Sequence, residues 1–283
     1  MPLNPDYVGK VYSDKPRVIT AEEGIAYAKA TLDPTPSLLS GEAIPPMFAV
    51  NPIIDVAMQV CRDPGLGVDL LRLVHGEERM HFGRLLRPGE MVRPESTITG
   101  IQNKASGELL QLTHRVWVGD EVVAESQSAY FIRSPKPKTS SPKVLNKPKT
   151  PARPEHNGAP IFNVEVRIPD EQPSAYAKAS RDFNPIHTDP IVAQKAGLPG
   201  CILHGLCTMA MAAHQVVTHV ASGDPGRLAS IGVRFSNLVL PGDSLHYRGF
   251  KLSSDQGEQV VGLQTLNQRD QFVLTKARAE VRN

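Results

Sequence analysis

The chain has 283 residues, enough for one large hydrophobic core or two domains of ordinary size. Apolar residues make up 40% and charged residues 21%, as in soluble globular proteins, which argues against wholesale disorder and fibrous repeats. The 31 basic and 29 acidic residues leave a formal net charge of +2, so no global field favours nucleic acid as a partner.

Targeting and redox features are sparse. Three scattered cysteines, Cys61, Cys201 and Cys207, suit a reducing compartment better than a disulfide framework. The N-terminus does not resemble a secretory signal, and no stretch approaches the ~18 apolar residues of a membrane span. The last residues, 280–283, do not resemble a peroxisomal tripeptide. We expect no membrane association and a cytoplasmic location in a bacterium or, in a eukaryote, a peroxisomal one without a recognisable C-terminal signal.

In chain order, the first half predicts a short helix near 26–33, an apolar helix over 47–61, and strands over 97–101, 109–117 and 121–132. Prolines and lysines then crowd residues 134–160, which predicts an extended, solvated linker. This linker divides the chain into an N-terminal domain, 1–133, and a C-terminal domain, 161–283.

The second half repeats the plan of the first. A helix over 203–220 is apolar almost all round, and four strands follow over 229–235, 244–250, 259–266 and 271–281. Because hairpin signals separate the strands, each sheet should be antiparallel. Residues 26–33 recur closely as 175–182, which indicates a tandem duplication. A buried helix embraced by a curved antiparallel sheet, occurring twice, predicts an α+β double hot-dog fold.

The strongest chemical signal is a carboxylate and an imidazole, Asp182 and His187, five residues apart. Between them Pro185 forces Asn184 out of helical geometry, so both side chains can face one cleft. A pair so placed suits acid/base work on one water, which contributes roughly 10² to 10⁴-fold to a rate. The alternative is an ordinary turn, in which Asp and Asn side chains bond to nearby backbone.

A second signal lies at Gly205, where the long apolar helix should begin. Free backbone N–H groups and the positive end of the helix dipole meet there, and they can stabilise an oxyanion. The alternative is that Gly205 only permits close packing of helix and sheet, and both can hold together.

These motifs resemble those of the MaoC-like (R)-specific 2-enoyl-CoA hydratases, also called hydratase 2. The resemblance rests on Asp182-Phe183-Asn184-Pro185-Ile186-His187 followed by Ile202-Leu203-His204-Gly205-Leu206-Cys207-Thr208. In the first half, Val74-His75-Gly76-Glu77-Glu78 resembles a segment of the two-hot-dog version found in peroxisomal multifunctional enzyme type 2.

The resemblance implies roles for individual residues. Asp182 and His187 would activate a water that adds OH to C3 and a proton to C2 of a trans-2-enoyl-CoA, giving the (3R)-hydroxyacyl-CoA. The Gly205 amide would receive the thioester oxygen, and Asn184 would hold the loop. The substrate would be lined by these four residues together with His75, Gly76, Lys104, Phe183, Pro185, Ile186 and Phe235. Lys104 is either a phosphate contact or a solvated loop lysine.

Two departures qualify the resemblance. Arg181 replaces the usual glycine before the aspartate, where it could disturb the loop or meet an anionic part of the substrate. In the first half, Asp33 is followed by Pro34-Thr35-Pro36, with no histidine at the matching spacing. We therefore expect one active site per chain, with the degenerate half remodelled to admit a longer acyl chain.

No metal or cofactor is expected. The histidines and cysteines lack metal-ligand spacing, no dinucleotide fingerprint is found, and CoA enters as part of the substrate. Three alternatives stay open: an acyl-carrier-protein dehydratase using the same residues in reverse, a hot-dog thioesterase, and a noncatalytic acyl-thioester binder. Similar proteins suggest a homodimer.

Overall fold

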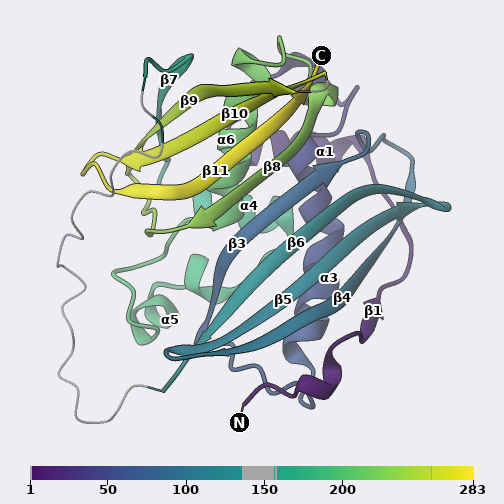
Figure 1. Ribbon diagram of the computed structural model, residues 1–283, viewed down its shortest axis with the longest axis vertical. Coiled ribbons are helices and arrows are strands. Elements are labelled where there is room, and N and C mark those ends of the chain that lie inside the picture. The colour runs from purple at the N-terminus through teal and green to yellow at the C-terminus, as the bar shows by residue number, and fades with distance from the viewer. Residues whose placement is uncertain (1, 136–155, 157, 256) are drawn as a thin grey trace.

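The computed structural model describes residues 2–135, 156, 158–255 and 257–283. In these residues eleven strands form one antiparallel sheet in the order β1-β4-β5-β6-β3-β8-β11-β10-β9-β7, with β2 beside β4 (Figure 1). The first half of the chain contributes one end of the sheet and the second half the other.

The first repeat begins with short strands and helices and ends in a meander of long strands. Its elements are β1 (Val11–Ser13), β2 (Arg17–Val18), α1 (Ala21–Ala30), α2 (Pro36–Leu39), α3 (Val50–Arg62), β3 (Leu73–Phe82), β4 (Met91–Lys104), β5 (Gly107–Val118) and β6 (Glu121–Arg133). 3-10 turns span Pro5–Tyr7 and Pro46–Ala49.

The second repeat follows the same plan. Its elements are β7 (Phe162–Arg167), α4 (Gln172–Ser180), the 3-10 turn η3 (Pro185–His187), α5 (Pro190–Lys195), α6 (Gly205–His219), the 3-10 turn η4 (Pro225–Arg227), β8 (Leu228–Phe235), β9 (Ser244–Asp255), β10 (Glu258–Asn267) and β11 (Phe272–Arg282).

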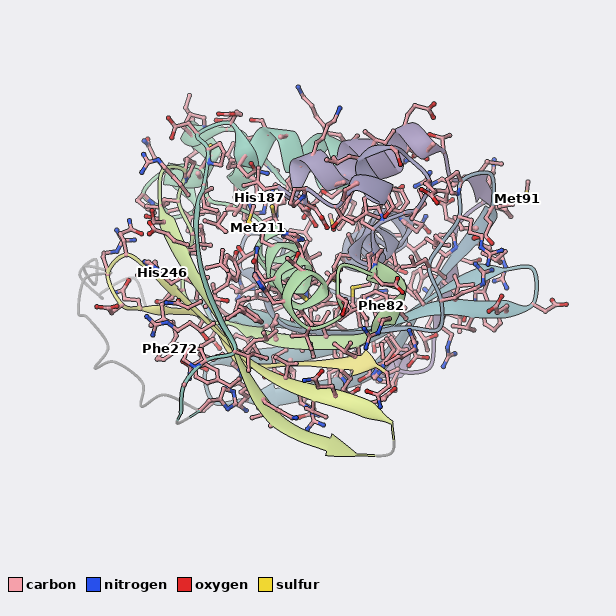
Figure 2. The ribbon with its side chains drawn as sticks, turned by 90° about the horizontal axis from the view of Figure 1, so that it is seen from above. Phe82, Met91, His187, Met211, His246 and Phe272 are labelled. Carbon is pink, nitrogen blue, oxygen red and sulfur yellow. The ribbon has the colours of Figure 1, made fainter. Side chains whose placement is uncertain are left out.

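Each part of the sheet curves around one central helix. Helix α6 is buried without interruption from Cys207 to Val217, because its small and apolar side chains let the strands approach from several sides. It packs on β8, β9, β10 and β11, while α3 packs on β4 and β5. Figure 2 shows α6 along its axis, between the sheet on one side and the outer helices on the other. The predicted double hot-dog fold is confirmed.

The two repeats share one sheet and one core. Strands β3 and β8 pair antiparallel from Glu77↔Arg234 to His81↔Ser230, which joins the two halves edge to edge. On the helical side α1 lies against α4, and the Tyr27 and Tyr176 hydroxyls, at matching repeat positions, are 3.2 Å apart. Hydrophobic residues of both repeats belong to the same buried cluster.

Most predicted elements are confirmed, with two corrections. The helix expected over 47–61 begins as a 3-10 turn, and its α-helical part starts at Val50. Strand β3 was not predicted, because its buried side holds Glu78 and its register shifts at Gly76, so it lacks apolar alternation. Of the expected linker, residues 136–155 and 157 lie outside the described residues. No helix in the described ranges is long and apolar enough to cross a membrane.

Candidate functional site

The site is built on the loop that follows α4. The helix ends at Arg181, whose φ of +66° is left-handed, and this turn carries Asp182 out of the helix direction. The Asp182 carboxylate accepts the Asn184 amide at 3.2 Å, and the Asn184 side chain accepts the Ile186 amide at 3.3 Å. Asn184 therefore bonds within the loop, in line with its expected role, and the turn-forming bonds of the alternative interpretation are present as well.

His187 closes the same loop, as the last residue of the turn η3, and is buried. Its Nδ1 lies 2.8 Å from the Ile202 carbonyl, to which it donates, so Nε2 is left unprotonated in the neutral ring. Burial lowers the pKa of His187 below its ordinary value, against an opposing pull from Asp182. The ring is therefore a neutral proton acceptor near neutral pH.

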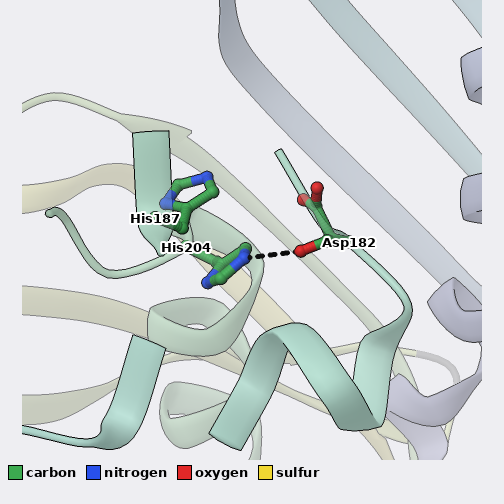
Figure 3. A group of neighbouring side chains, drawn as sticks. All are labelled: Asp182, His187 and His204. Carbon is green, nitrogen blue, oxygen red and sulfur yellow. Dashed lines mark hydrogen bonds between the residues drawn. The ribbon is translucent and has the colours of Figure 1, made fainter. Parts of the chain in front are cut away.

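The predicted pair converges on one space together with a third residue, His204 (Figure 3). A carboxylate oxygen of Asp182 and nitrogens of both imidazoles lie within 4.8 Å of one another. His204 stacks on His187, with ring centroids 3.6 Å apart and planes at 24°, and its Nε2 donates to the Asp182 carbonyl at 3.1 Å. Sequence reasoning missed His204; the available signal was its place directly before Gly205.

The geometry of this trio favours acid/base chemistry over metal binding. One nitrogen of each imidazole already donates to a backbone carbonyl. The lone pair of a ring nitrogen lies in the plane of its ring. Because the two ring planes are nearly parallel and the ring centroids are 3.6 Å apart, the two lone pairs do not point at one ion at a ligand distance of about 2 Å. Burial and the neighbouring His187 also lower the pKa of His204, so both rings are neutral. The absence of a metal stays a prediction.

Gly205 starts α6 beside the pair, and His204 at the N-cap supplies no side-chain cap. The amides of Gly205 and Leu206 have no partner among the described residues and can receive an anionic oxygen, whereas the Cys207 amide donates to the His204 carbonyl at 3.1 Å. A Cβ on Gly205 would lie 2.9 Å from Phe235 Cδ1, and the Phe235 ring stands 5.0 Å from that of His75. The structure thus brings together His75, Gly205 and Phe235 from both repeats.

Replacing Gly205 by Ala is expected to lower turnover by roughly 10²-fold, because the methyl group must displace Phe235 or the helix end by a large fraction of an ångström. Steady-state kinetics would measure this. In a double-mutant cycle, F235A should rescue G205A partly, since it removes the clashing ring. Wild-type activity in G205A would contradict a role for this helix end.

His75 is anchored from the first repeat by a buried polar network. Its Nε2 lies 2.9 Å from the carboxylate of Glu78, which is 3% exposed and also accepts hydrogen bonds from Ser126 and Ser128. His114 bonds to Ser128 and to Ser96, which completes the chain of partners. Gly76 occupies the register shift between His75 and Glu77.

The remaining predicted binding residues are more exposed than Asp182, His187 and Gly205 or have fewer contacts with them. Phe183 is 64% exposed, Pro185 is exposed, and Ile186 is half-buried on the same loop. Lys104 is exposed at the end of β4, where its Nζ donates to Gln102 at 2.8 Å. No contact links Lys104 to the other site residues in the part of the chain that the structure describes. Its phosphate role stays a prediction.

Arg181 adopts a conformation that glycine tolerates better, and its guanidinium pairs with Asp55 on α3 at 2.7 Å. The left-handed backbone costs a non-glycine residue about 1 to 2 kcal/mol. The ion pair is largely exposed and stabilises by no more than about 1 kcal/mol. We expect R181G to be about 1 kcal/mol more stable to urea than R181A, because both lose the pair but only R181G relieves the strain. Equal stability would contradict this account.

In the first repeat, Asp33 stands at the position that matches Asp182, but it has a different partner. Asp33 lies 3.2 Å from Nδ1 of His214, which comes from the central helix of the other repeat, and both side chains are 8% exposed. The cavity beside them has a volume of only about 10 Å³, space for a single water. A larger groove of about 560 Å³ crosses the sheet, and none of its lining residues belongs to the predicted site.

Comparison with known proteins finds a family match in each half of the chain. Residues 151–271 match the MaoC like domain family, and residues 6–126 match the FAS1-like dehydratase domain region. The C-terminal half of the chain is thus similar to MaoC-like domains. The matched segment contains the loop with Asp182 and His187 as well as the start of α6.

Relatives extend the likeness across both repeats. Peroxisomal enoyl-CoA hydratase 2 of Arabidopsis thaliana is 28% identical over 64% of this chain and 61% of its own. Peroxisomal multifunctional enzyme type 2 of Mus musculus is 31% identical over 66% of this chain and 25% of its own. The matches thus span less than two thirds of either relative. A solved MaoC-like dehydratase, 21% identical, superimposes with a TM-score of 0.81 over 98% of both chains.

Proposed function

We propose that the protein catalyses the reversible (R)-specific hydration of trans-2-enoyl-CoA to (3R)-3-hydroxyacyl-CoA, in fatty-acid metabolism or β-oxidation. The observation that carries the proposal is the convergence of Asp182 and His187 beside the uncapped start of α6. The relatives named enoyl-CoA hydratase 2 support the reaction type.

The proposed chemistry uses one water and no covalent intermediate. The water donates one hydrogen bond to the Asp182 carboxylate and one to Nε2 of His187, whose other nitrogen is tied to Ile202. The water oxygen bonds to C3 while negative charge moves to the thioester oxygen, which the Gly205 amide receives. A proton from the activated water reaches C2 on the same face, so H and OH are both accounted for.

The direct test is loss of the enoyl absorbance on crotonyl-CoA and decenoyl-CoA, followed by determination of the C3 configuration. An (S) product, or no absorbance change on any chain length, would contradict the proposal. We further propose that the degenerate repeat allows long acyl chains. Much faster turnover of crotonyl-CoA than of decenoyl-CoA would contradict that extension while leaving the reaction intact.

A carrier-protein dehydratase is the second candidate, because the first half matches the FAS1-like dehydratase domain region. It would use the same residues in the reverse direction. Dehydration of a 3-hydroxyacyl carrier protein, without activity on the CoA thioester, would favour it. Release of free thiol would identify a thioesterase instead, and tight binding without turnover would identify an acyl-thioester binder.

Three further expectations belong to this proposal. The enzyme should need neither a metal nor a cofactor, so prolonged treatment with a chelator should leave hydration unchanged. It should be a homodimer, which light scattering of the purified chain would test. Its location is proposed to be cytoplasmic in a bacterium or peroxisomal in a eukaryote.

A further inference from the structure

Resting on the proposed function, we propose that His204 is a positioning residue, which holds Asp182 through one hydrogen bond and His187 through one ring stack. Its imidazole is 2% exposed and touches both members of the pair. The next residue in the chain, Gly205, begins α6, so His204 fixes three parts of the site relative to one another.

The hydrogen bond ties the loop to the rest of the domain. Within the described ranges, the other hydrogen bonds of Asp182 are with close neighbours, from its amide to the Ser180 hydroxyl at 3.2 Å and from the Asn184 amide at 3.2 Å. The bond from His204 Nε2 spans 22 residues of sequence. It therefore restrains where the Asp182 backbone sits, directly after the left-handed residue Arg181.

The stack restrains His187 from its face, while Ile202 restrains it from its edge. Both restraints come from the short segment 202–204, so His187 cannot turn without moving away from that segment. On its other side His204 meets the Tyr176 ring at 4.9 Å, which supports it from α4. A ring held on face and edge keeps Nε2 aimed at the shared space with Asp182.

His204 is a poor choice for stability alone. Its Nδ1 is buried without a hydrogen-bond partner among the described residues, and an unpaired buried acceptor destabilises the folded state. Ser, Thr, Asn or Asp at this N-cap would stabilise α6, yet His204 provides no cap bond. A residue that lowers local stability at such a position points to a functional role.

The test compares H204F, H204Q and H204A with wild type, using H246F on β9 as the control. H204F keeps a ring for stacking but loses the N–H donor, so kcat should fall by roughly 10²-fold at nearly unchanged thermal stability and with KM changed less than about threefold. H204Q restores a donor and should recover part of kcat. H246F should behave as wild type.

A titration of His187 by NMR tests the same inference without turnover. H204A opens space for water beside the ring, so the His187 pKa should rise toward 6.5 relative to wild type. An inactive wild type with this pKa rise in H204A would refute the proposed function but keep the positioning role. H204F with wild-type kcat, or H204A with an unmoved His187 titration, would overturn the positioning role.

Discussion

Replacing Asp182 by Asn is expected to lower enoyl-CoA hydration by at least roughly 10²-fold while the protein stays folded. Asn keeps the shape and can still accept the Asn184 amide, so the loop should survive. It removes the negative charge that polarises the water. The matched control is D189N in the following turn, because Asp189 caps α5 and Asn caps equally well.

Replacing His187 by Ala should cause a loss of similar size, since the Nε2 acceptor disappears. Initial rates with crotonyl-CoA or decenoyl-CoA, together with circular dichroism, would measure both variants. Near-normal activity in either D182N or H187A would overturn the assignment of the pair. A comparable loss in D189N would show that the loop is merely fragile.

The pH dependence follows from the burial of His187. Its neutral form is the active base, and burial lowers its pKa below 6.5. Hydration should therefore remain constant as the pH falls from 8 to 6.5 and decline only in more acidic buffer, as kcat/KM for the free enzyme would show. An acidic limb centred above 6.5 would contradict a buried, neutral His187.

The largest stability effect is expected at Asp33. The buried Asp33 carboxylate pairs with the buried His214 imidazole, and D33A leaves that imidazole without this partner, so D33A should destabilise the protein by about 2 kcal/mol. Asp33 also accepts the Thr35 amide at 3.0 Å, which D33A loses as well. Urea unfolding of D33A against D33A/H214L would test this. The double variant should recover part of the loss, because no unpaired imidazole remains.

The stabilisation that Asp33 contributes should depend on pH, and its pKa fixes the direction of the change. Burial opposes ionisation of Asp33, but the interaction with His214 and the hydrogen bonds from Thr35 together outweigh it and lower the pKa of Asp33 below 3.8. A lowered folded pKa gives stability that is present above 3.8 and lost as the pH falls through the folded value. The difference in free energy of unfolding between wild type and D33A should therefore have its full size at neutral pH and decrease only below about pH 3.8. A difference in free energy of unfolding that stays constant at lower pH would contradict the pairing of Asp33 with His214.

Much of the fold was predictable because its signals are local. The apolar residues of 203–220 and the turns between the strands of the second half each specify an element without reference to distant residues. Asp182 and His187 are likewise joined by one short turn, so their convergence follows from Pro185 and the Asn184 side chain.

Contacts between distant residues were not predictable. His204 meets Asp182 from 22 residues away, and Asp33 finds its partner on the helix of the other repeat. Strand β3 carries Glu78 inward because Ser126 and Ser128 of β6 satisfy its carboxylate. Each of these polar residues is of a type that is usually exposed, so the sequence does not predict its burial. It is buried because a residue distant in the sequence supplies a hydrogen-bond partner in the fold.

The pairing of β3 with β8 has an evolutionary consequence. A second repeat separated from the first would expose the β8 edge, a row of open amides and carbonyls from Ser230 to Arg234 that could pair with other chains. The first repeat covers that edge. Selection can therefore preserve the first repeat although it has no histidine at the matching position, because deleting that repeat would leave the β8 edge open to pairing with other chains.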